Sequence, residues 1–135
     1  MNFEFSDDQL VMKEEVRKLF EKEDSVKRNR NILEGEENFD KDLWNKVVEM
    51  GLTAITIPEE HGGIGLGFLE LCVVAEEMGR AIAPIPYSSS VYLATTAIIN
   101  SSNDDVKKEY LAKLAAGEMI GTFAPVSYTH LTLPT

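Results

Sequence analysis

The sequence predicts an all-α fold, a bundle of about five helices. Three observations favour this class. Apolar residues recur at helical spacing in several segments, residues that cap or stop helices flank those segments, and alternating strand patterns are almost absent. No segment repeats with a period of roughly 20 to 50 residues, which excludes a solenoid. The length of 135 residues suits one modest core.

The first helix is expected to begin after Ser6. Ser6 and Gln9 have capping-box spacing, and the two aspartates between them suit the positive end of the helix dipole. The polar segment 23–38 carries Gly35. It is expected to be either a frayed continuation of the first helix or a solvated connection.

Asp40 is expected to cap a second helix over residues 41–50. Gly51 then stands where helices commonly stop in the left-handed conformation. Residues 52–57 are short, apolar and β-branched, and Pro58 follows them. This pattern predicts an extended entry into the loop beyond.

Three further helices are predicted over residues 68–83, 87–100 and 104–116. Pro84 is expected to end the first of them and Gly117 the last. One apolar face of the 68–83 helix is expected to face the core, with Cys72 packing as a small apolar residue and Glu76 pairing with Arg80. That core face consists of Leu71, Val74, Met78 and Ile82.

The loop from His61 to Gly67 reads HGGIGLG and invites comparison with phosphate-binding loops. It lacks both the G-x-G-x-x-G spacing and the Gly-Lys-Ser/Thr ending that such loops need. The glycines are therefore expected to serve backbone geometry. His61 has no second ligand at metal spacing, and Glu59 and Glu60 are adjacent, so they point apart. We predict neither a metal site nor an acid–base pair here.

The charge balance limits the classes of partner. Thirteen basic and twenty-three acidic residues give a net charge of −10, which argues against nucleic acid. The phosphates of a coenzyme would need basic residues supplied from elsewhere. No apolar run approaches the ~20 residues that span a bilayer. The acidic amino terminus is unlike a secretory signal, and a single cysteine fits a reducing compartment, so a cytoplasmic location is expected.

Four stretches resemble the amino-terminal helical domain of the acyl-CoA dehydrogenases. They read FSDDQL, LWNKVVEMGLTAITIPEEHGGIGLG, EEMGRAIAP and KKEYLAKLAAGEMIGTFA, and the resemblance spans Phe5 to Ala124. It implies a helical domain over residues 1–124, the first part of an α–β–α flavoenzyme, with the middle β domain starting at about residue 120. The helix at 87–100 is then similar to one that lines the acyl cavity, which makes Tyr87, Ser90 and Ala94 candidate pocket residues. Ordinary capping and packing explain the same three residues.

The resemblance implies a parent enzyme that desaturates an acyl-CoA thioester with FAD. Its general base, a glutamate, and most flavin contacts would lie in domains beyond this chain. We therefore expect no catalytic, cofactor-binding or metal-binding residue here, only part of the cavity wall. An oligomer, homomeric or heteromeric, and an electron acceptor are the expected partners.

Residues 125–135, PVSYTHLTLPT, depart from the family, whose strand continues here into a flavin-holding Thr-Glu-Pro motif. Pro125 interrupts a strand, and the segment is similar to translated sequencing-adaptor sequence. It is expected to be a non-native tail, so His130 is not a candidate site. Two alternatives stay open: a related flavin oxidase or monooxygenase, and a stand-alone helical interaction module or inactive partner subunit.

Overall fold

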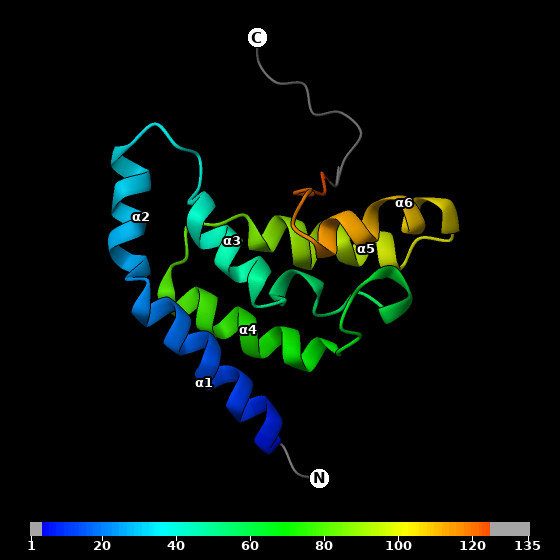
Figure 1. The fold of residues 1–135 in the computed structure, drawn as a ribbon, viewed down its shortest axis with the longest axis horizontal. Coiled ribbons are helices and arrows are strands. Elements are labelled where there is room, and N and C mark those ends of the chain that lie inside the picture. Colours follow the sequence, from blue (N-terminus) through cyan, green and yellow to red (C-terminus); the bar gives the residue numbers. More distant parts are fainter. Residues whose placement is uncertain (1–3, 125–135) are drawn as a thin grey trace, which may run out of the picture.

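The computed structural model describes residues 4–124, and the predicted tail at 125–135 lies outside them. The described residues are helical, with no strand among them, which confirms the all-α prediction (Figure 1). In chain order the elements are α1 (Asp7–Lys22), α2 (Ser25–Glu34), α3 (Lys41–Glu49), the 3-10 turns η1 (Leu52–Ala54) and η2 (Glu59–His61), α4 (Phe68–Ala81), the π-helix η3 (Ser88–Thr95), α5 (Thr96–Ile99) and α6 (Asp104–Ala115).

The local signals at helix ends are confirmed. The Ser6 Oγ accepts the Gln9 amide at 3.3 Å, and the Gln9 side chain accepts the Ser6 amide at 2.9 Å, which completes the capping box. Asp40 caps α3 by accepting the Leu43 amide at 2.9 Å. Gly51 follows α3 with a φ of 77°, in the left-handed region that glycine favours.

The polar segment 23–38 contains a separate helix, α2, rather than a frayed continuation of α1. The chain turns at Asp24, whose φ is +47°, and Asp24 then caps α2. The Arg28 guanidinium bonds to the carboxylates of Glu23 at 2.8 Å and Asp40 at 2.9 Å, and so ties α2 to the end of α1 and the start of α3. Both carboxylates lie outside residues 25–34, so the apolar spacing within this segment does not indicate the contacts that stabilise the helix.

The predicted extended entry at 52–57 is wrong, because the chain forms the 3-10 turn η1 instead. The described residues offer no neighbouring strand to pair with an extended segment. Turn bonds satisfy the backbone, with the Ala54 amide donating to Gly51 at 3.1 Å and the Ile57 amide to Ala54 at 3.2 Å. The buried Thr53 hydroxyl donates to the Ala115 carbonyl at 2.7 Å and joins η1 to α6.

Helix α4 ends at Ala81, earlier than predicted, because Ile82 adopts a left-handed φ of +50°. Ile82 is 60% exposed, so its predicted place on the core face is wrong. The prediction that Cys72 packs in the interior is also wrong, since Cys72 is exposed. The predicted helix at 87–100 is present as η3 followed by α5. After α6, Gly117 has the expected left-handed φ of 69°, and residues 119–124 form no strand.

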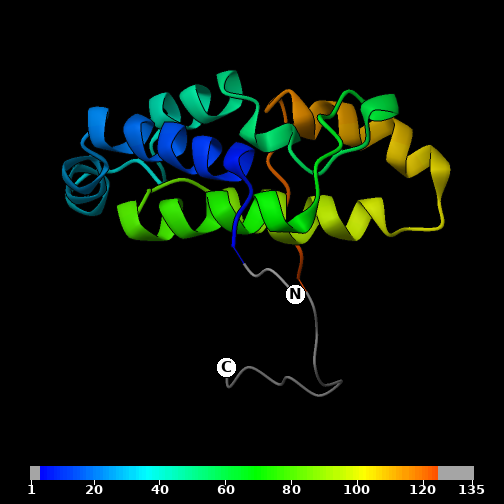
Figure 2. The same ribbon diagram turned by 90° about the horizontal axis from the view of Figure 1, so that it is seen from below.

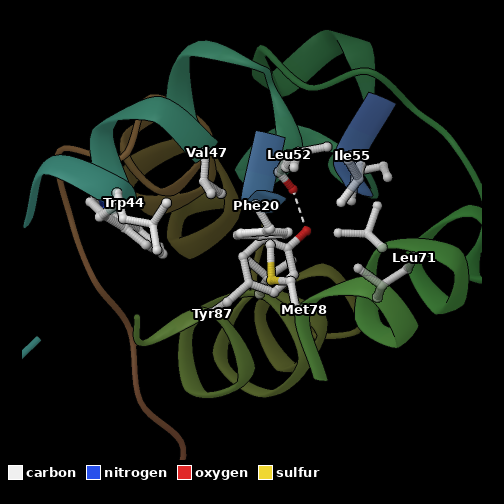
Figure 3. Packing of buried hydrophobic residues seen from close by; sticks show 12 residues of the cluster. Phe20, Trp44, Val47, Leu52, Ile55, Leu71, Met78 and Tyr87 are labelled. Atoms are coloured by element: carbon white, nitrogen blue, oxygen red, sulfur yellow. Dashed lines mark hydrogen bonds between the residues drawn. The ribbon is translucent and has the colours of Figure 1, made fainter. Parts of the chain in front are cut away.

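Figure 2 shows two layers, with α1, α3 and α6 in one and α4 and η3–α5 in the other. The main core fills the space between them, and Figure 3 shows its centre. A second cluster packs α6 against η1. Among residues 4–124, no helix combines the length and apolarity that crossing a membrane requires. The main core consists of Val16, Phe20, Leu43, Trp44, Val47, Leu52, Ile55, Leu71, Val74, Met78, Tyr87 and Val91.

Candidate functional site

The backbone amides of the glycine-rich loop all donate to nearby acceptors, mainly carbonyls of residues 54–59 just before it. A Cβ atom on Gly63 would lie 1.8 Å from the Ile57 carbonyl oxygen, so only glycine fits there. Because the amides are occupied, the loop offers no amide cradle for a phosphate, and the prediction that its glycines serve backbone geometry is confirmed. The donating amides are those of Gly62, Gly63, Ile64, Gly65 and Leu66, and their acceptors are the carbonyls of Glu59, Pro58, Ala54, Ile57 and Ile55.

The titratable side chains of this loop do not converge. The His61 Nε2 lies 3.9 Å from a carboxylate oxygen of Glu60, which is exposed to solvent. Within residues 4–124, no three His, Cys, Asp or Glu side chains gather as metal ligands would. The loop therefore has neither the donor set of a metal site nor a base placed against an acid.

The one deeply buried carboxylate belongs to Glu77 on α4, among the residues described. Its two oxygens accept the Arg17 guanidinium of α1 at 2.7 and 3.0 Å, and Arg80 lies 3.3 Å away. The Arg17 hydrogen bonds outweigh burial and lower the pKa of Glu77. Both oxygens are occupied, so Glu77 joins α1 to α4 rather than acting as a base. The predicted Glu76–Arg80 pair is absent, because Glu76 pairs with Lys13 at 2.8 Å.

Tyr87, the first predicted pocket residue, lies inside the core with 2% of its surface exposed. Its hydroxyl donates to the Leu52 carbonyl at 2.6 Å, and its ring lies near Phe20 and Met78 (Figure 3). The ring also meets Tyr92 edge to face at 5.2 Å. Burial raises the pKa of Tyr87 far above its ordinary value. In this arrangement Tyr87 joins η3 to η1.

Ser90 and Ala94 lie on the inner side of η3, with 2% and 5% of their surfaces exposed. The Ser90 hydroxyl accepts the Gly121 amide at 3.2 Å, and Gly121 also approaches Ala94 closely. Tyr87, Ser90 and Ala94 thus share one face, as the sequence indicated, and that face packs on the protein's own residues. Their role in lining a ligand pocket stays a prediction.

The outward side of η3 carries Leu93, which is 48% exposed, together with the exposed Ser88. Sequence reasoning missed Leu93 because it assumed ordinary α-helical spacing and favoured small or hydroxylated residues. In η3 the hydroxyl of Thr95 donates to the carbonyl of Ser90, five residues earlier, at 2.8 Å. The three serines at 88–90 and the two threonines at 95 and 96 are the sequence signal from which an irregular helix could have been predicted.

Two of the open hollows among the described residues are more apolar in their lining than charged. The first, of about 310 Å³, lies beside the end of α4 and is lined by Met78, Ile82, Ile85, Tyr87 and Tyr92 among others. The second, which we call the α1 groove, has about 280 Å³ and lies between α1 and the glycine-rich loop. Its lining is mainly apolar with two carboxylates at its edge, and includes Val11, Met50, Ile64 and Leu66 with Asp8 and Glu15. The α1 groove is the more apolar surface feature of the two.

Comparison with known proteins gives a consistent result. Residues 6–118 match the family model described as "Acyl-CoA dehydrogenase, N-terminal domain". The mitochondrial isovaleryl-CoA dehydrogenase of Arabidopsis thaliana is 35% identical over 124 residues, which cover 89% of this chain and 30% of the plant protein. The chain thus spans about a third of the length of such relatives.

Solved structures agree on the arrangement of the helices. The ChsE4–ChsE5 complex of Mycobacterium tuberculosis is similar with a TM-score of 0.81 and 26% identity, covering 90% of this chain and 34% of that one. An acyl-CoA dehydrogenase of Bacillus anthracis, solved in complex with FAD, has a TM-score of 0.74 and 26% identity, covering 87% of this chain and 21% of that one.

Proposed function

The chain belongs to the acyl-CoA dehydrogenase family, whose amino-terminal helical domain it contains, and on that premise we propose that it is part of a longer FAD-dependent enzyme that introduces an α,β double bond into an acyl-CoA thioester. The match over residues 6–118 carries this proposal. The short coverage of the relatives supports a missing remainder, with the helical domain at 1–124 and a β domain starting at about residue 120.

Within that enzyme we assign this chain part of the wall of the acyl cavity. Leu93 on η3, and Phe68 and Leu69 on α4, are large apolar side chains that the described residues leave exposed. Such side chains are suited to cover an acyl chain and to exclude water from it. The inward residues Tyr87, Ser90 and Ala94 would shape this wall by fixing the position of η3.

The reacting groups come from elsewhere in the proposed enzyme. FAD, when bound, takes up the hydride that leaves the β-carbon of the substrate. The loop at 61–67 has no free amides for the phosphates of FAD, so the cofactor is assigned to the following domains. The base that removes the α-proton is proposed to be a glutamate of the carboxy-terminal helical domain. The net charge of −10 likewise requires that basic residues for coenzyme A come from those domains.

The proposed partners are a second subunit and an electron acceptor. The similar Mycobacterium tuberculosis structure is a complex of two named proteins, which supports an oligomer for the parent enzyme. We place the enzyme in the cytoplasm, since a single cysteine suits a reducing compartment.

Recovery of the reading frame beyond codon 124 tests this proposal. The continued protein is expected to carry a β domain and a glutamate-bearing helical domain, to purify with an FAD spectrum, and to lose flavin absorbance when an acyl-CoA is added without oxygen. A frame that ends shortly after Ala124 would refute it. If the recovered sequence lacked the glutamate and its reduced flavin were rapidly reoxidised by oxygen, the oxidase or monooxygenase alternative would be favoured.

A matched pair of variants tests the cavity wall. Leu93→Ala in the continued enzyme is expected to shift the preference among acyl-CoA chain lengths, because it enlarges the cavity. Leu33→Ala is the control, since Leu33 is also an exposed leucine, at 79%, but belongs to a different helix, α2. If both variants showed the same preference among acyl-CoA chain lengths, η3 would not be part of the cavity wall.

The alternative of a helical interaction module is favoured by the α1 groove. An apolar side chain of a partner protein, flanked by basic residues that meet Asp8 and Glu15, is the occupant that suits its charge. Replacing Leu66 with Lys would then abolish the binding of that partner by the 135-residue chain.

A further inference from the structure

The chain leaves α6 along a path that is held at two glycines. At Gly117, a Cβ atom would lie 2.3 Å from a methyl group of Val48 on α3. The amides of Glu118 and Met119 both donate to the Lys113 carbonyl, at 3.0 and 3.3 Å. At Gly117 the chain thus turns out of α6. Figure 2 shows the orange-to-red segment that follows crossing towards the layer of α4 and η3.

The second point is Gly121. Its amide donates to the Ser90 hydroxyl at 3.2 Å. A Cβ atom added to Gly121 would lie 2.5 Å from the Ala94 Cβ and 3.4 Å from a methyl group of Leu114. Both distances are measured to side chains on two different helices, η3 and α6. The backbone at 121 therefore lies directly against η3, with no room for a side chain on that side.

Ser90 is itself held in place. Its amide donates to the Pro86 carbonyl at 3.1 Å, and its carbonyl accepts the Thr95 hydroxyl at 2.8 Å. Because Ser90 is also buried, its hydroxyl has little freedom to turn towards another partner. Beyond Gly121, the side chains of the described residues are exposed, and Phe123 is 49% exposed.

We propose that Ser90, Ala94 and Gly121 form a clasp that couples η3 to the segment leaving the helical domain, so that the two move as one body. The clasp uses the inner side of η3, while Leu93 lies on the outer side of the same helix. If the proposed function holds, the clasp links the wall of the acyl cavity to the entry of the next domain. Only this last link rests on the proposed function, because the clasp itself is measurable in the 135-residue chain.

Amide hydrogen exchange of the isotope-labelled 135-residue chain tests the hydrogen bond. In Ser90→Ala, the Gly121 amide is expected to exchange about fivefold faster, which corresponds to the loss of one ordinary buried hydrogen bond. The Leu111 amide in the middle of α6 is expected to change much less. Ser88→Ala is the matched control, because Ser88 is an exposed serine of the same helix. An unprotected Gly121 amide in the unchanged chain, or equal acceleration at Gly121 and Leu111, would overturn the proposal.

A double-mutant cycle tests the close approach. Gly121→Ala is expected to lower the melting temperature, because its new methyl group meets the Ala94 methyl. In an Ala94→Gly background that methyl is gone, so Gly121→Ala is expected to cost less than half as much. Equal losses in the two backgrounds would show that positions 94 and 121 are not coupled, and would refute the clasp whatever the parent enzyme does.

Discussion

Replacing Tyr87 with phenylalanine removes a single oxygen atom from the centre of the main core. That hydroxyl donates to the Leu52 carbonyl at 2.6 Å and joins η3 to the 3-10 turn η1 (Figure 3). The ring stays in place, so its contacts with the surrounding apolar side chains and its edge-to-face contact with Tyr92 are retained. The variant therefore isolates the hydrogen bond from the packing.

The expected loss of stability follows from burial. Tyr87 is 2% exposed, so water has little access to the Leu52 carbonyl when its donor is removed. A buried polar group left without a partner costs about 1–3 kcal/mol, and we take about 1.5 kcal/mol. The entropy of unfolding of a 135-residue chain is about 0.28 kcal/mol per kelvin, which converts this loss into a fall of about 5 °C in the melting temperature.

Thermal unfolding followed by circular dichroism measures this difference, with Tyr92→Phe as the matched control. Tyr92 is half-buried, and no bond of its hydroxyl to protein is present among the described contacts, so Tyr92→Phe is expected to cost less than about 0.5 kcal/mol. Equal melting temperatures for the two variants would refute the reasoning, because they would show that the Tyr87–Leu52 bond contributes nothing net.

The stability of Tyr87→Phe at alkaline pH gives a second test of the same hydrogen bond. Burial raises the pKa of Tyr87 above its ordinary value of 10.0, so its contribution to stability is complete below pH about 10 and is lost as pH rises towards the folded-state value. Phenylalanine has no proton to lose. The difference in the free energy of unfolding between the wild type and Tyr87→Phe is therefore expected to shrink by about 1.4 kcal/mol per pH unit above pH 10 and to vanish about one unit higher, as urea unfolding would show.

Three further changes have expected outcomes. Arg17 lowers the pKa of Glu77 below 4.5, so this carboxylate stabilises the fold above that pH and loses the effect as pH falls through its folded-state value. When pH falls from about 6 to about 3, the free energy of unfolding measured with urea should therefore decrease less for Glu77→Gln than for the wild type. Gly63→Ala should cost at least about 2 kcal/mol because its Cβ has no room, whereas Gly79→Ala, with open space in α4, should add about 0.5–1 kcal/mol, and the reverse order of melting temperatures would contradict both. Arg28→Met should cost about 1–3 kcal/mol and speed amide exchange mainly within α2, because it removes the cation paired with the largely buried Asp40 carboxylate, whereas Glu23 keeps Lys46 at 2.6 Å; uniform exchange changes across the chain would contradict this.

The sequence predicted the helices whose ends are set by nearby residues. The capping box at Ser6, the cap at Asp40 and the left-handed stop at Gly51 each depend on bonds that reach three or four residues along the chain. The glycine-rich loop was likewise predictable, because its amides and carbonyls pair within the same short segment. The family resemblance, which the comparison confirms, followed from the same stretches.

The candidate site was predictable only in part. The sequence indicated the right helix and correctly placed Tyr87, Ser90 and Ala94 on one face, but it gave no means of deciding which way that face points. Spacing along a helix specifies which residues share a side, and it does not specify what lies against that side. The partner of Ser90 is Gly121, which lies 31 residues further along the chain.

What the sequence by itself determined is therefore the family, the all-α class and most helix boundaries, since these depend on short-range capping and periodicity. Only the tertiary structure decided the separate helix α2, the turn at Leu52 and the inward face of η3. Each depends on a contact between residues distant in sequence, such as Arg28 with Asp40 or Tyr87 with Leu52. These contacts form because the helices pack together, and a pattern read along one segment contains no information about the partner that another segment brings to it.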